Sequence, residues 1–115
     1  MGLLSIVFGK SGRNKLREAL NHMRTYCKEH PSQMIDIFGH SCQHEVIKEK
    51  ILHLLSQNGL NTNYLVMKDV RVRGNWIDDY KASVNVKNYD LYVLFNETVT
   101  AIRVAILEEE RRRTL

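Results

Sequence analysis

The sequence has few cysteines and no long apolar run, and each shortage excludes a class of protein. Two cysteines in 115 residues, Cys27 and Cys42, do not make a disulfide framework, and neither belongs to a CxxC pair. The longest apolar stretch, residues 2–8, is far shorter than the roughly 20 residues that a membrane-spanning helix needs. We therefore expect a cytoplasmic protein with reduced thiols and no transmembrane segment.

Motifs for targeting and for chemistry are also scarce. No charged side chain precedes the apolar stretch and no cleavage site follows it, which argues against a signal peptide. Ile6 stands where a myristoylation signal requires Ser or Thr, and Leu4 stands where a phosphate-binding loop ending in Gly9-Lys10-Ser11 requires glycine. No nucleophile elbow is present. We assign no catalytic residue and no cofactor.

The composition is that of a single globular domain with a basic N-terminal third. Apolar residues make up 43% of the chain and charged residues 26%, which are ordinary values. The first 30 residues contain six basic and two acidic side chains, so the net charge of +4 lies there and the remainder is neutral. An acidic partner is therefore expected first at this end.

Residues 12–59 are predicted to form a helical layer. Apolar residues at helical spacing predict a helix from about Gly12 to Glu29, capped by Ser11 and ended by Pro31. Residues 32–39 fit an edge strand or a short helix ending at Gly39, and we favour the helix. A second long helix is expected from a cap at Ser41 to about Gln57, with Asn58-Gly59 as the stop.

Residues 62–107 are predicted to form a four-stranded antiparallel meander. Tyr80 to Lys87 alternates strictly between apolar and polar side chains, and Tyr64 to Arg73 alternates less regularly. Asp90 to Asn96 is more continuously apolar, as in a central strand, and Ile102, Val104 and Ile106 are expected to face the core. The predicted fold is two-layer α+β, with two main helices on this sheet and a charged tail at 108–115.

The apolar segment 1–11 allows two interpretations. It can pack into the core as a short strand or helical turn, or it can act as an amphipathic anchor on a membrane surface or a partner. We favour core packing.

The leading functional hypothesis is a small non-catalytic binding module. We expect it to contact another protein, or itself as a homodimer, through the open sheet face or an edge strand. The alternative is nucleic-acid binding through the basic first helix and the basic outer sheet face. The residues assigned to that alternative are Arg13, Lys15, Arg17, Arg24, Arg71, Arg73, Lys81, Lys87 and Arg103.

A metal-dependent enzyme is the third hypothesis. His40, Cys42 and His44 form the one local cluster of zinc-ligand types, and two histidines four apart share a helical face. Structural zinc sites take a second pair of ligands, which only Cys27 and His30 could supply. We therefore keep these three residues as weak candidates and assign no metal.

Overall fold

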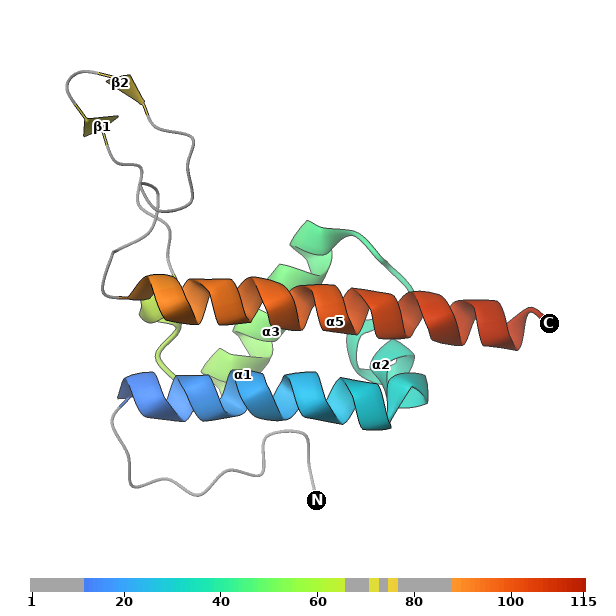
Figure 1. Ribbon diagram of the computed structural model, residues 1–115. Helices are drawn as coiled ribbons and strands as arrows, with labels where there is room; N and C mark the ends of the chain where they lie inside the picture. Colours follow the sequence, from blue (N-terminus) through green and yellow to red (C-terminus); the bar gives the residue numbers. More distant parts are fainter. Residues whose placement is uncertain (1–11, 66–70, 73–74, 77–87) are drawn as a thin grey trace.

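The computed structural model describes residues 12–65, 71–72, 75–76 and 88–115, and within them four α-helices form the core (Figure 1). They are α1 (Gly12–Glu29), α2 (Pro31–Phe38), α3 (His44–Gln57) and α5 (Tyr89–Arg113). A 3₁₀ helix, η1 (Thr62–Leu65), follows α3. The two-residue strands β1 (Arg71–Val72) and β2 (Asn75–Trp76) pair antiparallel.

The longest helix, α5, is the element on which the others pack. It contacts α1, α2, α3 and η1. Figure 1 shows α1 and α5 side by side with their N-terminal ends at the same end of the molecule, while α3 passes behind them. The core side chains come from all four helices: Leu16, Leu20, Met23, Phe38, Ile47, Ile51, Leu55, Leu91, Phe95, Ile102 and Ile106.

The predicted helical layer is largely confirmed. α1 has the predicted bounds, and its apolar residues at helical spacing, which include Leu16, Leu20 and Met23, are buried. The segment after Pro31 is the short helix α2, with Pro31 in its first turn. It ends at Gly39, whose φ of 82° lies in the left-handed region that glycine tolerates.

The second long helix begins later than predicted. Ser41 is not its cap, because α3 starts at His44 and Gln43 stands at the N-cap position. The Ser41 hydroxyl instead accepts a hydrogen bond from the Gln43 amide at 3.4 Å. The predicted stop is confirmed: Gly59 has a φ of 76°, and the Leu60 amide returns to the Leu55 carbonyl at 3.0 Å.

The predicted α+β fold with a four-stranded sheet is wrong. The segments 90–96 and 99–107, predicted as strands, are one continuous helix, α5. The only strand pairing in the described parts of the chain joins Arg71 to Trp76 and Val72 to Asn75. Tyr64 and Leu65 belong to η1. The predicted strand 80–87, the cap Ser11 and the segment 1–11 lie outside the described residues.

The error has a physical origin in the spacing of β-branched residues. Ile102, Val104 and Ile106 alternate with Arg103 and Ala105, and so match a period of two over a short window. Over the whole segment, the buried residues follow helical spacing: Leu91, Phe95, Thr98, Ile102, Ala105 and Glu109. Ile102 is buried as predicted, whereas Val104 is 46% exposed.

Two polar residues are accommodated inside α5. The Asn96 side chain donates a hydrogen bond to the Tyr92 carbonyl at 2.9 Å, one turn earlier. The Thr98 hydroxyl lies close to two carbonyls, that of Leu94 at 2.8 Å in its own helix and that of Leu20 at 3.3 Å in α1. Both side chains bond within the helix instead of ending it.

Candidate protein-binding face

The side of α5 that faces away from the core carries a second row of residues at helical spacing. We call this row the outer face of α5, and its members are Val93, Glu97, Thr100, Val104, Leu107 and Arg111. They follow one another at alternating intervals of four and three residues, which aligns side chains along one side of a helix. Val93, Val104 and Leu107 are 36%, 46% and 45% exposed. α5 therefore has one buried apolar side and one exposed, partly apolar side.

A groove of about 590 Å³ runs along the N-terminal half of this face. It is lined by α5 residues that include Tyr89, Val93 and Thr100, and His44 contributes from the start of α3. Arg24 and Lys28 line it from α1. The groove thus combines a mixed apolar and polar lining from α5 with basic side chains on the α1 side.

A second groove of about 360 Å³ lies further along α5. It shares Lys28 and Ala101 with the first groove, and it is also lined by Val104 and Glu108. Because the two grooves have residues in common, they are adjacent. Together they follow α5 from Tyr89 to Glu108.

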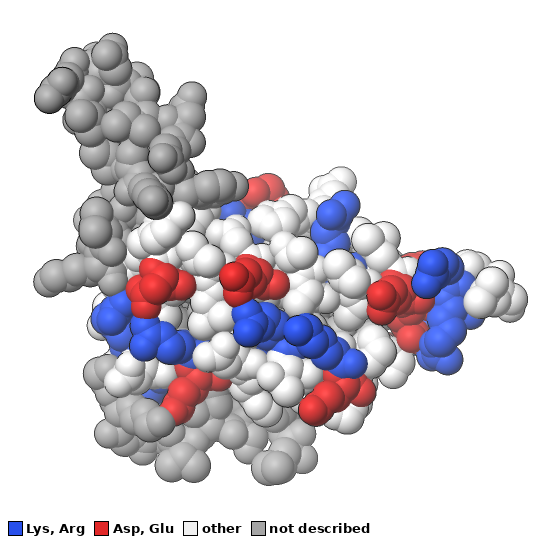
Figure 2. Space-filling model, in the orientation of Figure 1, with Lys and Arg blue, Asp and Glu red and all other residues white. Residues whose placement is uncertain are grey.

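Ion pairs join α1 to α5 beside this face. Arg13 and Arg17 both contact the Asp90 carboxylate, the first at 2.9 Å, and Arg13 also donates to the Asn88 side chain at 3.0 Å. Further along, Arg24 pairs with Glu97 at 2.5 Å. Figure 2 shows the result: basic and acidic side chains alternate on this side of the molecule instead of forming one basic area.

Asp90 is held in its charged form by these contacts. Partial desolvation raises the pKa of Asp90, but the Leu91 amide, the Arg17 hydrogen bond and the charges of Arg13 and Arg17 outweigh it. The net effect is a pKa below the ordinary value.

The residues assigned to nucleic-acid binding are therefore spread over different environments. Arg13, Arg17 and Arg24 belong to the ion pairs above, and Lys15 lies partly buried on α1. Arg103 is exposed on α5 and donates to the Cys42 carbonyl at 2.9 Å. Arg71 lies in β1, and three residues are outside the described part of the chain: Arg73, Lys81 and Lys87.

The zinc candidates point in different directions. His40 contacts the Glu110 carboxylate, the Cys42 thiol faces the His40 carbonyl at 3.7 Å, and His44 lines the first groove. Cys27 is buried and donates to the Arg24 carbonyl at 3.1 Å. Over the described ranges, no three His, Cys, Asp or Glu side chains are grouped so that they could hold a metal ion.

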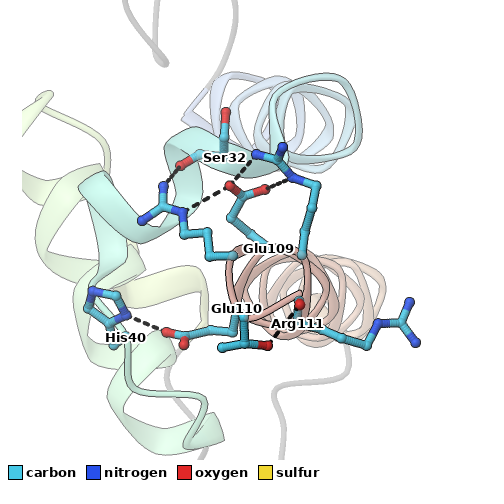
Figure 3. A network of polar contacts seen from close by, with 8 residues as sticks. Ser32, His40, Glu109, Glu110 and Arg111 are labelled. Atoms are coloured by element: carbon cyan, nitrogen blue, oxygen red, sulfur yellow. Dashed lines mark hydrogen bonds and ion pairs between the residues drawn. The ribbon is translucent and has the colours of Figure 1, made fainter.

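A buried carboxylate anchors the C-terminal end of α5. Glu109 is only 2% exposed, and it pairs with Arg112 at 2.5 Å and Arg113 at 3.0 Å (Figure 3). Arg113 also reaches the Ser32 carbonyl of α2 at 3.5 Å. The hydrogen bond from Arg112, assisted by Arg113, lowers the pKa of Glu109 despite its burial.

In the same region, Arg111 takes no part in this network. Figure 3 shows its side chain directed away from Glu109 and from the His40–Glu110 contact. Residues 108–113, predicted as a charged tail, are thus the last turns of α5, with Glu109 inward and Arg111 outward.

Sequence reasoning missed the outer face of α5. It placed Val104 in the core and did not single out Val93 or Leu107. The available signal was the seven-residue spacing of Val93, Thr100 and Leu107, which is visible only when 89–113 is treated as one helix.

Comparison with protein-family models, with curated proteins and with solved structures gives no match. In the part of the chain that the structure describes, no helix has both the length and the apolar character required to cross a membrane.

Proposed function

We propose that this protein is a non-catalytic binding module that docks a helix of a protein partner on the outer face of α5. The observation that carries the proposal is the exposed apolar row of Val93, Val104 and Leu107 on a helix whose other side is already buried. An amphipathic helix has one apolar side, which packs on the core. A second apolar row at helical spacing is typical of a helix that contacts another helix.

The surroundings of the outer face support docking of a helix in particular. The two adjacent grooves follow the direction of α5, so a rod-shaped ligand can lie along them. Charged side chains of both signs, Arg24 and Lys28 from α1 and Glu108 from α5, line the grooves. Charged flanks around an apolar strip favour one orientation of the partner over the other.

The same charges make nucleic-acid binding through α1 the weaker hypothesis. A protein that binds phosphates needs basic side chains that release counterions on binding. Arg13, Arg17 and Arg24 already share the carboxylates of Asp90 and Glu97. A phosphate approaching them would have to displace or sit beside those carboxylates.

Site-specific photo-crosslinking tests the proposal. A benzoylphenylalanine is placed at Val104 in the full chain, and the control carries it at Asp36, which is exposed on α2 outside the grooves. Both variants are irradiated as pure protein and in an extract of the source cells. We expect a discrete protein adduct at position 104 and none at position 36. Equal or absent adducts at the two positions would refute the proposal.

A further inference from the structure

The outer face of α5 is complementary to itself when it is reversed. Arg111 lies seven residues after Val104 and Glu97 lies seven residues before it. At 1.5 Å per residue, each charge is about 10 Å along the helix from Val104. Reversing the face about Val104 therefore places a guanidinium where a carboxylate stood, and a carboxylate where a guanidinium stood.

Other residues of this side of α5 match under the same reversal. Leu107 falls opposite Ala101, two apolar side chains, and Glu108 falls opposite the Thr100 hydroxyl. Val93 falls at the level of Leu115, which follows the last turn of α5 and is fully exposed in the single chain. No like charges meet on the outer face in this arrangement.

We propose that the partner docked on the outer face of α5 is a second copy of this chain, antiparallel to the first, with the two-fold axis through Val104. This inference rests on the proposed function, of which it names the partner. A two-fold contact requires that each position complement its own mirror position along the helix. The outer face meets that requirement in charge and in apolar character.

Both charged members of the pair are available to a second copy. The Glu97 carboxylate is about half exposed although it pairs with Arg24, so its free side can accept a second guanidinium. Arg111 is exposed and directed away from the Glu109 network (Figure 3). The dimer thus gains two symmetric Glu97–Arg111 pairs without breaking the contacts of the single chain.

Lys28 adds a second charge match at the edge of the contact. It lines the grooves beside Ala101 and Glu108. The reversal brings Glu108 of the second copy to the level of Thr100, one residue from Ala101. An ammonium from one copy then lies near a carboxylate from the other, twice in the dimer.

Competing arrangements of two copies are less complementary. A parallel, in-register pair places Glu97 against Glu97 and Arg111 against Arg111, and such like-charge contacts are unfavourable. An antiparallel pair shifted by half a heptad places Glu97 against Leu107, which leaves a carboxylate facing an apolar side chain.

Sedimentation of the full chain with charge-reversal variants tests the proposal. We expect a monomer–dimer equilibrium for the natural sequence. E97R and R111E alone should each raise the dimer Kd roughly ten- to hundredfold, since each creates two like-charge contacts. The double variant E97R/R111E should recover most of the affinity. V104E, at an exposed position, should abolish the dimer. A cooperative thermal unfolding transition, measured at a concentration where every form is monomeric, would show that each variant is folded.

Spin-label distances test the orientation. A label at T114C, in a C42S background where the remaining Cys27 is buried, reports the separation of the two C-terminal ends. The antiparallel dimer predicts about 30 Å, because Thr114 lies ten positions after Val104 in each copy, whereas a parallel dimer predicts roughly 10 Å.

The possible outcomes separate the two proposals. A strict monomer up to millimolar concentration, a short label distance, or a double variant as weak as the single ones would overturn the antiparallel dimer. If a crosslink at position 104 to a different protein accompanies the monomer, the binding module stands and the second copy is excluded. If position 104 gives no adduct at all, both proposals fall.

Discussion

Along α5, Phe95, Ile102 and Glu109 follow one another at seven-residue intervals, and so do Val93, Thr100 and Leu107 on the opposite side. The first three are at most 2% exposed, whereas Val93 and Leu107 are 36% and 45% exposed. The same spacing therefore appears twice, once covered by α1, α2 and α3 and once facing solvent. The inner side therefore sets the stability of the fold, whereas the outer side, which we propose as a docking surface, contributes little to it.

Shortening an aromatic side chain on the inner side should have the largest effect. Phe95→Ala should lower the free energy of unfolding by about 3–5 kcal/mol, because it removes a fully buried ring and leaves a cavity. Val93→Ala is the matched control on the outer side, and it should change the same quantity by less than about 0.5 kcal/mol. Urea unfolding at a concentration where the chain is monomeric measures both. Similar losses of unfolding free energy for the two variants would contradict the assignment of a buried inner side and an exposed outer side.

Acidification should weaken the inner contact at Glu109. The pKa values of Glu109 and Asp90 are lowered in the folded protein. Such carboxyls stabilise the fold above their unfolded pKa, and this contribution is lost as the pH falls through the folded pKa. The urea midpoint should therefore decrease below roughly pH 4, near the ordinary pKa of these side chains.

Glu109→Gln distinguishes the contribution of Glu109 to the pH dependence from that of Asp90. It should lower the midpoint at neutral pH and make the decrease on acidification shallower, because one of the two carboxylates with a lowered pKa has been removed and Asp90 remains. Glu108→Gln, one residue away and exposed, should keep the steeper profile of the natural sequence. A profile for Glu109→Gln identical to that of the natural sequence would contradict the role assigned to Glu109.

Removing one buried hydroxyl should have a moderate effect. Thr98→Val keeps the β-branched shape but loses the contacts with the Leu94 and Leu20 carbonyls. We expect a loss of about 0.5–1.5 kcal/mol in unfolding free energy, as for a typical hydrogen bond. Thr100→Val on the outer side should be close to neutral in the same urea experiment. A larger cost at position 100 than at position 98 would contradict the assignment of the two sides.

The exposed ion pair between the helices should matter least for stability. Glu97→Gln should reduce the unfolding free energy of the monomer by less than about 1 kcal/mol, because the pair with Arg24 is solvent-accessible. If Glu97 serves association, the same variant should weaken the dimer measurably in sedimentation. If Glu97→Gln destabilised the monomer strongly but left the dimer Kd unchanged, the roles assigned to the two sides of α5 would be wrong.

The sequence predicted the elements whose signals are local. α1 has helical spacing over five turns and is followed by Pro31, and α2 and α3 end at glycines with positive φ. α5 was missed because it contains many β-branched residues, and side-chain packing overrode their preference for strands. Asn96, a residue typical of turns, did not reveal the helix either, because its side chain bonds to the Tyr92 carbonyl within it.

The candidate site was less accessible to sequence reasoning than the fold. Arg13, Arg17 and Arg24 were correctly placed on the first helix, but their carboxylate partners lie more than 70 residues away in the chain. Pairing over that distance depends on the tertiary arrangement. The outer face could be recognised only after residues 89–113 were known to be helical. In a strand Val104 would share a face with Ile102, whereas in a helix it lies on the opposite side.

The parallel packing of α1 and α5 affects how the chain folds. Arg17 and Arg24 meet residues that are 73 positions later, so α1 is synthesised long before the helix that covers it. During synthesis, the apolar side of α1 that packs on α5 therefore remains exposed until α5 has been made. Closing so long a loop carries an entropic cost, and folding should accordingly be slow for an all-helical core of this size.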